Sequence, residues 1–161
     1  MPSAPINVTS ANQAVLTFGT TAVMAAPGGT KGLIVPLVHD ITVNAAPGTV
    51  RYSTLDSTSS SAFTTVNENS VSFNMLLDED TFFGNSSITL NTIAENGLLT
   101  TSINKTEVFF SIAFEGSDSG DNYVHGSGFI GGIAPTASID AAVWLSPGEI
   151  IVNGELAKST V

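Results

Sequence analysis

Residues 126–131, Gly-Ser-Gly-Phe-Ile-Gly, match the G-x-G-x-x-G pattern that binds the pyrophosphate of a dinucleotide. That chemistry needs the glycines between a strand and the first turn of a helix, whose free N–H groups bind the phosphate oxygens. Here Pro135 follows closely, and the residues beyond it alternate like a strand. The pattern therefore predicts a glycine-rich strand that another backbone can approach closely, without a cofactor site.

The ionisable residues do not form a recognisable catalytic or metal-binding set. The acidic stretches 78–80 and 118–122 lack the spaced carboxylates and closing glutamate of a calcium loop, so solvated turns or a helix entry are expected. His39 and His125 are the two histidines and so the two side chains that could act as a base near neutral pH. His39 is adjacent to Asp40 in sequence, but a catalytic carboxylate must contact the imidazole in space, so this adjacency does not indicate a catalytic pair. Cysteine is absent and there is no G-x-S-x-G elbow. The sequence predicts no enzyme, no cofactor and no metal, although paired carboxylates cannot be read from a β sequence.

The charge composition limits the possible partners. The 161 residues carry a net charge of −10, and 11% of them are charged, compared with about 25% in typical soluble domains. The four basic residues form no cluster that could grip a nucleic acid backbone. The apolar run 33–38 is far shorter than the roughly 20 residues of a membrane helix. A weakly charged surface on a chain of positive mean hydropathy is typical of a protein covered by a partner.

Short runs rich in β-branched residues, separated by Pro-Gly turns, indicate strands through most of the chain. The expected strands are 13–19, 31–38, 39–44, 49–54, 70–76, 104–116, 121–134, 138–146 and 149–156, with turns at 26–30, 45–49 and 147–148. The one helical pattern, Leu90, Ile93 and Ala94, predicts a short helix about 87–96 that begins at Ser86 or Ser87 and ends at Gly97. The predicted fold is all-β with one short helix (α+β minor), an antiparallel β-sandwich or partly closed barrel forming a single domain over 1–161.

Residues 53–69 are rich in Ser, Thr and Asn and show no helical period. They predict a long loop or a flexible hairpin, and a loop of this length inside a compact domain is usually functional.

From residue 70 onward the order is strand, helix and then four strands, with "EVFFSIAFEG" at 107–116 and a glycine-rich strand at 126–133. This arrangement resembles the tail tube (major tail) proteins of long-tailed bacteriophages and gene transfer agents. The resemblance implies a β-sandwich protomer that joins five others in a ring. Rings stack into a hollow tube, the sheets line the bore, and a long loop or hairpin reaches the neighbouring ring.

The resemblance also implies roles for individual residues. The expected inter-ring residues are Ser53, Thr54, Leu55, Asp56, Phe63, Thr64 and Thr65. The expected bore-facing acids are Glu107, Asp140, Glu149 and Glu155, and the expected subunit-interface residues are Phe82, Phe83 and Phe109. The N-terminal segment 1–12 and the C-terminal segment 157–161 are further candidate arms.

The implied partners are copies of the same chain, a tape measure protein inside the tube, and terminator or distal tail proteins at its ends. DNA passes through without specific binding, and no membrane is involved. The implied location is the virion, in the phage tail, after assembly in the bacterial cytoplasm.

Two other functions remain open from the sequence. A capsid decoration or cement protein is also a small acidic β protein with an N-terminal arm, but it forms trimers on a capsid. A carbohydrate-binding β-sandwich of a tail fibre or adhesin displays exposed aromatic residues beside carboxylates. Trp144, between Val143 and Leu145, is more simply explained as a core or interface residue.

Overall fold

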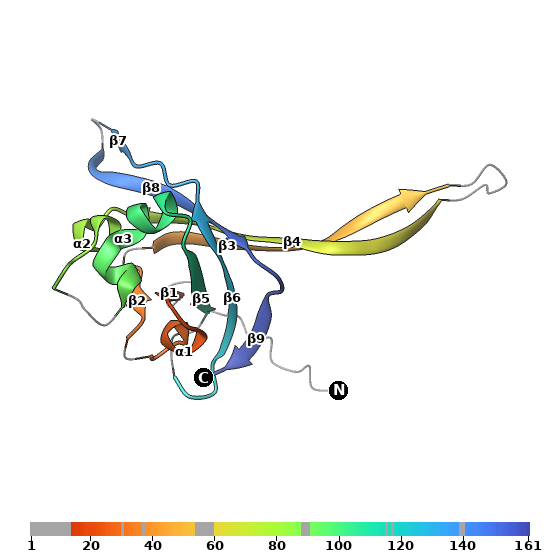
Figure 1. Cartoon of the computed structure of the whole chain (residues 1–161), viewed down its shortest axis with the longest axis horizontal. Helices are drawn as coiled ribbons and strands as arrows, with labels where there is room; N and C mark the ends of the chain where they lie inside the picture. Colours follow the sequence, from red (N-terminus) through yellow and green to blue (C-terminus); the bar gives the residue numbers. More distant parts are fainter. Residues whose placement is uncertain are drawn as a thin grey trace, which may run out of the picture.

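The protein is built on one antiparallel sheet. The computed structural model describes residues 14–29, 31–36, 38–53, 60–87, 91–114, 116, 118–138 and 141–161. In this part of the chain nine strands pair in the order β2-β1-β5-β6-β8-β4-β3, with β7 beside β8 and β9 beside β6 (Figure 1). The strands are β1 (Val15–Gly19), β2 (Leu33–Ile34), β3 (Val38–Tyr52), β4 (Ser61–Leu76), β5 (Glu107–Ala113), β6 (Asn122–Gly131), β7 (Thr136–Ser138), β8 (Ala141–Val152) and β9 (Ala157–Thr160). The predicted antiparallel all-β class is confirmed, and the sheet stays open because β2 and β3 form its two ends.

The hydrophobic core lies on one side of the sheet, which we call the inner face. Side chains alternate between the two faces in β4 and β5, since Val71, Phe73 and Phe110 are buried while Ser72 and Glu107 are exposed. Two helices, α2 (Glu79–Phe83) and α3 (Thr92–Ile103), cover this face, and a short helix α1 (Ala22–Ala25) lies beside β1 and β5. The buried cluster consists of Leu16, Phe18, Val35, Val71, Phe73, Met75, Phe82, Ile93, Leu98, Val108, Phe110, Ile112, Ile130 and Ile150.

The helical part differs from the single helix predicted at 87–96. The chain first forms α2, whose N-cap Asp78 accepts a hydrogen bond from the Thr81 amide, as expected for a helix-entry acid. Helix α3 begins after Asn91 rather than after Ser86 or Ser87, because the Asn91 side chain caps it and also donates to the carbonyls of Phe18 and Lys31. These two carbonyls are distant in sequence, so no local pattern revealed this cap.

Gly97 does not end the helix. It adopts φ 77° and ψ 164° within α3, and the chain then resumes helical geometry to Ile103. A Cβ on Gly97 would lie 2.4 Å from the backbone nitrogen of Gly84, which itself has φ 93°. The two glycines therefore let the end of α2 pack directly against the middle of α3.

Two predicted turns are instead parts of continuous strands. Residues 45–49 lie within β3, where Pro47 sits on a sheet edge at a register shift and so removes no needed ladder hydrogen bond. Pro147-Gly148 lies within β8, between the stretch that pairs with β7 and the stretch that pairs with β6. There β8 has β4 alone as a neighbour, so proline is tolerated.

Strands β3 and β4 extend beyond the body of the protein as a two-stranded hairpin (Figure 1). Strand β4 pairs with β8 over Ser70–Leu76, so residues before Ser70 pair with β3 alone. We call Ala45–Tyr52 and Ser61–Asn69 the arm. Of the two structures expected for 53–69, the hairpin is the correct one, since β4 begins at Ser61. Seven residue steps from Ala45 to Tyr52 give the arm a reach of about 23 Å.

The C-terminal segment 157–161 was expected to be an arm, and this prediction is wrong. Residues Ala157–Thr160 form β9, which pairs with β6 from His125 to Asn122. The backbone amide of Val161 also donates to the Asp121 carbonyl. The expected N-terminal arm 1–12 lies outside the described residues. Among the described helices, none has the length and apolar character needed to span a bilayer.

Candidate assembly surfaces

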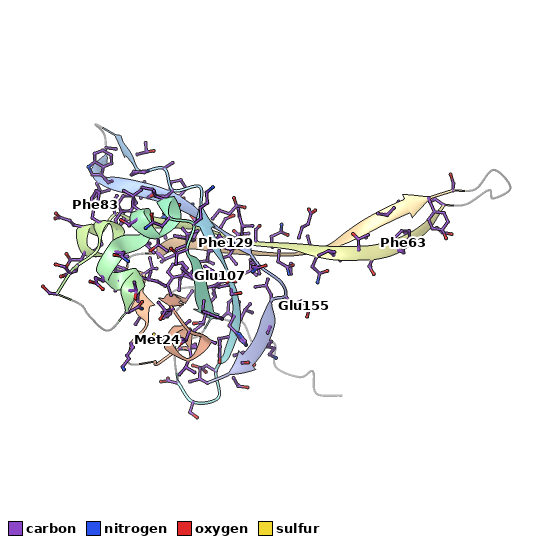
Figure 2. The ribbon with its side chains drawn as sticks, in the orientation of Figure 1. Met24, Phe63, Phe83, Glu107, Phe129 and Glu155 are labelled. Carbon is purple, nitrogen blue, oxygen red and sulfur yellow. The ribbon has the colours of Figure 1, made fainter. Side chains whose placement is uncertain are left out.

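The distal arm has two chemically different sides. Val50 of β3 lies opposite Phe63 of β4, and the rings of Tyr52 and Phe63 are 5.9 Å apart, so these three side chains share one side. Tyr52 and Phe63 remain 52% and 53% exposed. Figure 2 shows Phe63 near the far end of the arm. The neighbouring pair, Arg51 and Ala62, points to the other side because side chains alternate along a strand. The arm thus presents one apolar, aromatic side and one polar side with a cation.

A β-bulge sets which side carries Phe63. Pro47 pairs with Asn67 but Thr49 pairs with Thr64, so β4 has one more residue than β3 in this interval. Gly48 lies opposite the bulge, and a Cβ there would come within 2.4 Å of the Val66 carbonyl oxygen. The bulge reverses the alternation of β4, so Phe63 joins Val50 and Tyr52 rather than the opposite side.

The residues predicted for inter-ring contact are partly described. Phe63, Thr64 and Thr65 lie on the arm strand of β4 and are exposed, and Ser53 directly follows β3. Thr54, Leu55 and Asp56 lie outside the described residues. Sequence reasoning missed Val50 and Tyr52, because residues 45–49 were read as a turn and the strand 49–54 was not connected to the loop.

Two of the predicted bore-facing acids lie on the side of the sheet opposite the core, which we call the outer face. Glu107 pairs with Phe129, and Phe129 pairs in turn with Ile151. Glu149 precedes Ile151 by two residues on β8 and therefore points to the same face. The spacing of strands and residues places the two glutamates about 12 Å apart. Asp140 lies outside the described residues.

Glu107 is held in place by two neighbours. Its Oε1 accepts hydrogen bonds from Asn153 Nδ2 at 2.9 Å and Ser127 Oγ at 3.0 Å. These bonds favour the ionised carboxylate, so Asn153 first and Ser127 second lower the pKa of Glu107. The outer face therefore carries a fixed negative charge at this point.

Asp40, near the other end of the outer face, has a similar arrangement. Its carboxylate accepts hydrogen bonds from Asn74 Nδ2 at 2.9 and 3.1 Å and contacts His39 Nδ1 at 3.2 Å. The Asn74 and His39 contacts lower the pKa of Asp40. Asp40 and Asn74 are cross-strand partners on β3 and β4, so this second carboxylate is also fixed by the sheet register.

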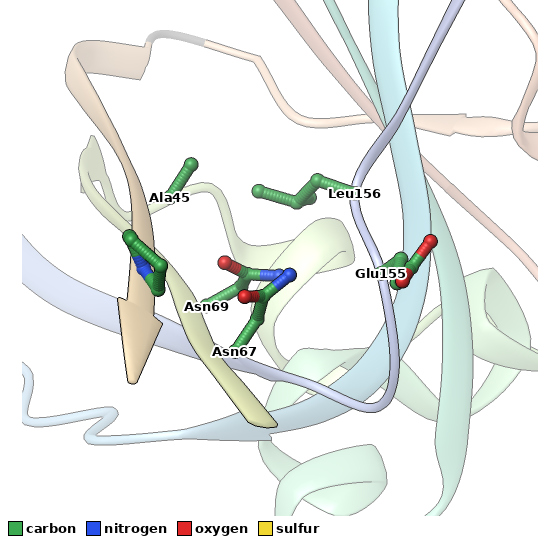
Figure 3. A pocket seen from close by; sticks show the side chains of 6 residues that line it. Ala45, Asn67, Asn69, Glu155 and Leu156 are labelled. Carbon is green, nitrogen blue, oxygen red and sulfur yellow. The ribbon is translucent and has the colours of Figure 1, made fainter. Parts of the chain in front are cut away.

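Glu155, the fourth predicted acid, lies in the segment between β8 and β9 rather than on a strand. It lines a groove of about 280 Å³ at the base of the arm (Figure 3). The other lining residues are Ala45, Pro47, Asn67, Asn69 and Leu156.

The three predicted interface aromatics have different environments. Phe82 is 1% exposed and belongs to the protomer core, so it is not available to a neighbouring subunit. The next residue, Phe83, is 58% exposed and packs edge-on against Phe82 at a ring distance of 5.0 Å. Phe109 is half-buried on the outer face, beside Ser127. Phe82 was misassigned because a helix turns successive residues to different sides, and the position of α2 was not foreseen.

Trp144, expected from the sequence to be a core or interface residue, lies on β8 and does not belong to the core. Val143, Trp144 and Leu145 are all exposed, although β8 pairs there with β4 and β7. Three consecutive apolar residues on a strand must place at least one side chain on each face. The run of three apolar residues, Val143, Trp144 and Leu145, was therefore the sequence signal that apolar side chains lie on both faces of β8.

The glycine-rich stretch is a strand, as predicted. Residues 126–131 lie in β6, and a Cβ on Gly128 would come within 2.3 Å of the Ile151 carbonyl oxygen. A Cβ on Gly126, two residues earlier on the same face, would meet Phe110 Cζ at 3.2 Å. The glycines serve close packing between strands and against the core.

The histidines lie on separate parts of the sheet. His125 Nε2 is 3.0 Å from Ser159 Oγ, and His39 contacts Asp40. Within the part of the chain that the structure describes, neither contact joins an imidazole to both a hydroxyl and a carboxylate, as a catalytic triad would require.

No protein-family model matches the chain, and no curated protein matches it in sequence. Solved structures do match it in fold. One is a chain in the tail of an empty gene transfer agent particle with C6 symmetry, at a TM-score of 0.62 and 11% identity, covering 95% of this chain and 100% of that one. A chain in the virion of a native gene transfer agent particle matches with the same values.

A third similar structure is that of the SPP1 tail tube. It matches with a TM-score of 0.66 and 8% identity, covering 96% of this chain and 80% of the other. The chain therefore has the fold seen in these tail structures, over nearly its whole length.

Proposed function

We propose that this chain is a structural virion protein that assembles into the hollow tube of a bacteriophage or gene transfer agent tail. Its fold is similar to chains of a gene transfer agent tail with C6 symmetry and of the SPP1 tail tube. On this proposal six copies form a ring, rings stack, and DNA passes through the bore during genome ejection. The chain serves as a building block of the tail and not as an enzyme.

The arm is the feature that supports this function most strongly. A two-stranded hairpin without further packing is at best marginally stable in water. The described residues of β4 before Ser70 pair with β3 alone, the arm extends beyond the body (Figure 1), and its aromatic side is half-exposed. Docking on a second copy would bury that side and stabilise the arm.

The outer face supports the second part of the proposal, an acidic bore. Glu107 and Glu149 lie on this face, and a ring of six copies carries six times the net charge of −10. Duplex DNA carries about one negative charge per 1.7 Å of axis, so a negative wall repels its backbone and does not retain it. We place the outer face toward the bore, with a tape measure protein inside before ejection and terminator or distal tail proteins at the tube ends.

Negative-stain electron microscopy of the purified full-length chain tests this function. The expected result is hollow rings at low concentration and tubes at high concentration. The double variant Tyr52→Ser/Phe63→Ser should remain folded, as judged by circular dichroism, but form no tubes. The control Thr49→Ser/Thr64→Ser alters the other side of the arm and should form tubes normally.

Other outcomes would favour the alternative functions. Compact trimers that bind an expanded capsid would indicate a decoration protein. Monomers that bind immobilised glycans would indicate a carbohydrate-binding domain. A wild-type chain that stays monomeric at every concentration contradicts the tube.

A further inference from the structure

The chain contains two Asn-Gly pairs, Asn96-Gly97 and Asn153-Gly154. In this dipeptide the glycine nitrogen can attack the amide carbon of the asparagine side chain, because glycine has no Cβ to obstruct the approach. The attack needs an accessible asparagine, a glycine N–H that is not engaged, and space for a five-membered ring. The structure provides these conditions at one pair and not at the other.

The second pair lies in a connection that bulges out of the sheet. Strand β8 pairs with β6 up to Val152, which lies opposite Gly128. Strand β9 resumes the pairing at Ala157, which lies opposite His125. Residues 153–156 therefore run beside a stretch of β6 that has two residues fewer, and they project from the ladder. Figure 3 shows the last two residues of this connection beside the base of the arm.

The surroundings of Gly154 leave its backbone nitrogen free. Asn153 and Gly154 are both exposed, and a Cβ on Gly154 would meet no atom within 4 Å. The Gly154 carbonyl accepts a hydrogen bond from Asn69 Nδ2 at 3.4 Å, whereas the Gly154 N–H donates to no described residue. The attacking group is thus unengaged and has space around it.

The first pair is confined by packing. Asn96 is exposed, but Gly97 is buried inside α3. A Cβ on Gly97 would lie 2.4 Å from both the Gly84 nitrogen and the Phe83 carbonyl carbon. A ring built on this backbone would collide with the end of α2, so reaction at Asn96 requires a local opening of the α2–α3 contact.

Glu107 restrains the side chain of Asn153. The Nδ2 of Asn153 donates to Glu107 Oε1 at 2.9 Å, which holds the amide in one orientation. The negative charge of Glu107 also opposes the negative charge that develops when the glycine nitrogen loses its proton. This contact slows the attack but leaves Gly154 exposed.

We propose that Asn153-Gly154 is a site of spontaneous amide-to-acid conversion in the folded protein, and that Glu107 sets its rate. The Gly154 nitrogen bonds to Asn153 Cγ, the Cγ–Nδ2 bond breaks, and Nδ2 leaves as ammonia with the proton from the Gly154 nitrogen. Water then opens the cyclic imide at either carbonyl and yields aspartate or isoaspartate. The step needs no reagent other than water.

Conversion changes both charge and backbone at this position. The new carboxylate replaces a hydrogen-bond donor to Glu107 by a like charge, which raises the pKa of Glu107. Isoaspartate also adds one methylene to the chain between β8 and β9, and among the described strands β9 pairs with β6 alone. The inference goes beyond the proposed function, since the chemistry belongs to the single protomer. If the outer face lines a bore, each converted copy adds one negative charge to it.

Peptide mapping by mass spectrometry of the full-length protein, kept dilute at neutral pH, tests the proposal. In the folded protein Asn153 should convert at least about tenfold faster than Asn96, because Asn96 must wait for local opening. In urea the two sites should convert at similar rates, because both are then free. Enzymatic methylation of isoaspartate identifies the product.

Two variants and a matched control address the residues involved. Asn153→Gln lengthens the side chain, disfavours the five-membered ring and should abolish conversion at 153 without changing Asn96. Glu107→Ala should speed conversion of Asn153, because it removes both the restraint and the opposing charge. Glu149→Ala removes an acid of the same face that has no recorded contact with Asn153, and should leave the rate unchanged.

Equal rates at Asn153 and Asn96 in the folded protein would overturn the proposal. Equal rates in Glu107→Ala and Glu149→Ala would contradict the role of Glu107. Both measurements use the unassembled protomer, so they stand whether or not the chain forms tubes. Absence of tubes from the wild-type chain contradicts the proposed function alone.

Discussion

Gly148 of β8 lies directly opposite Phe73 of β4, and the Phe73 ring occupies the space where a side chain on Gly148 would begin. A Cβ at this glycine would be 2.4 Å from Phe73 Cζ. Phe73 is itself 1% exposed and packs against Phe18 at a ring distance of 6.2 Å, so the ring has little room to move. The apparent turn signal Pro147-Gly148 thus reflects a packing requirement of the core.

Gly148→Ala should therefore destabilise the protein by about 1–3 kcal/mol, as expected for overpacking of a core. Urea denaturation of dilute protein, below the concentration of assembly, measures the change. Gly131→Ala is the matched control, because a Cβ there meets its nearest atom at an ordinary 3.8 Å and should change stability little. Equal stability of the two variants would contradict the packing of Phe73 on Gly148.

Asn91 should contribute more to stability than a helix cap alone. Its Oδ1 accepts from the Ile93 amide at 3.0 Å, while its Nδ2 donates to the carbonyls of Phe18 and Lys31. Asn91→Ala removes the cap and leaves buried carbonyl groups unsatisfied, so we expect a loss of about 2–3 kcal/mol in the free energy of unfolding. Asn91→Asp keeps the cap and should lose less. Asn96→Ala, at an exposed position of the same helix, is the control and should change little.

The environment of Glu107 predicts a specific pH dependence. Because Asn153 and Ser127 lower the pKa of Glu107, its stabilising hydrogen bonds are present above the pKa of the unfolded chain and are lost as the pH falls through the lower pKa of the folded protein. Asn153→Ala should raise the pKa of Glu107 toward its usual value. Carboxyl NMR titration measures this shift. The pKa of Asp40, which Asn74 and His39 lower, should stay the same in this variant and serves as the control.

Reversing charge on the outer face should affect DNA passage and leave assembly intact. If the outer face lines the bore of the proposed tube, Glu107→Lys/Glu149→Lys should form tubes of normal appearance but slow genome ejection, because lysines there would attract phosphates. Ejection kinetics from particles built with the variant measure the effect. Glu95→Lys/Asp118→Lys makes the same change in net charge away from the outer face and should eject normally. Unchanged ejection in the first variant would mean that these glutamates do not face the DNA.

The strands with one buried face were predictable from the sequence, because apolar and polar residues must alternate along such a strand. Val71 and Phe73 on β4, and Phe110 on β5, follow this rule. Pro47 and Pro147 were misread as turns because a local Pro-Gly signal does not show whether a neighbouring strand is present on both sides. The start of α3 was missed for a related reason, since Asn91 is fixed by carbonyls far away in sequence.

The assembly surfaces were predictable only in part. Glu107 lies on the face opposite Val108, which alternation along a strand is enough to predict. The aromatic side of the arm was not predictable, because the bulge opposite Gly48 decides which side Phe63 takes, and a bulge has no reliable sequence signature. Phe82 and Phe83 are neighbours in sequence with opposite burial, so composition could not separate the core residue from the exposed one.

The strand alternation of the arm also restricts how it can change in length over evolution. Removing one of the two bulge residues, Thr65 or Val66, would make the ladder regular and leave Phe63 opposite Val50, whereas adding or removing one residue in each strand would turn the whole aromatic side to the other side of the arm relative to the body. A hairpin of this kind should therefore tolerate insertions by even numbers of residues per strand. Engineered arms lengthened by one or by two residues in each strand would reveal this parity through the presence or loss of tubes.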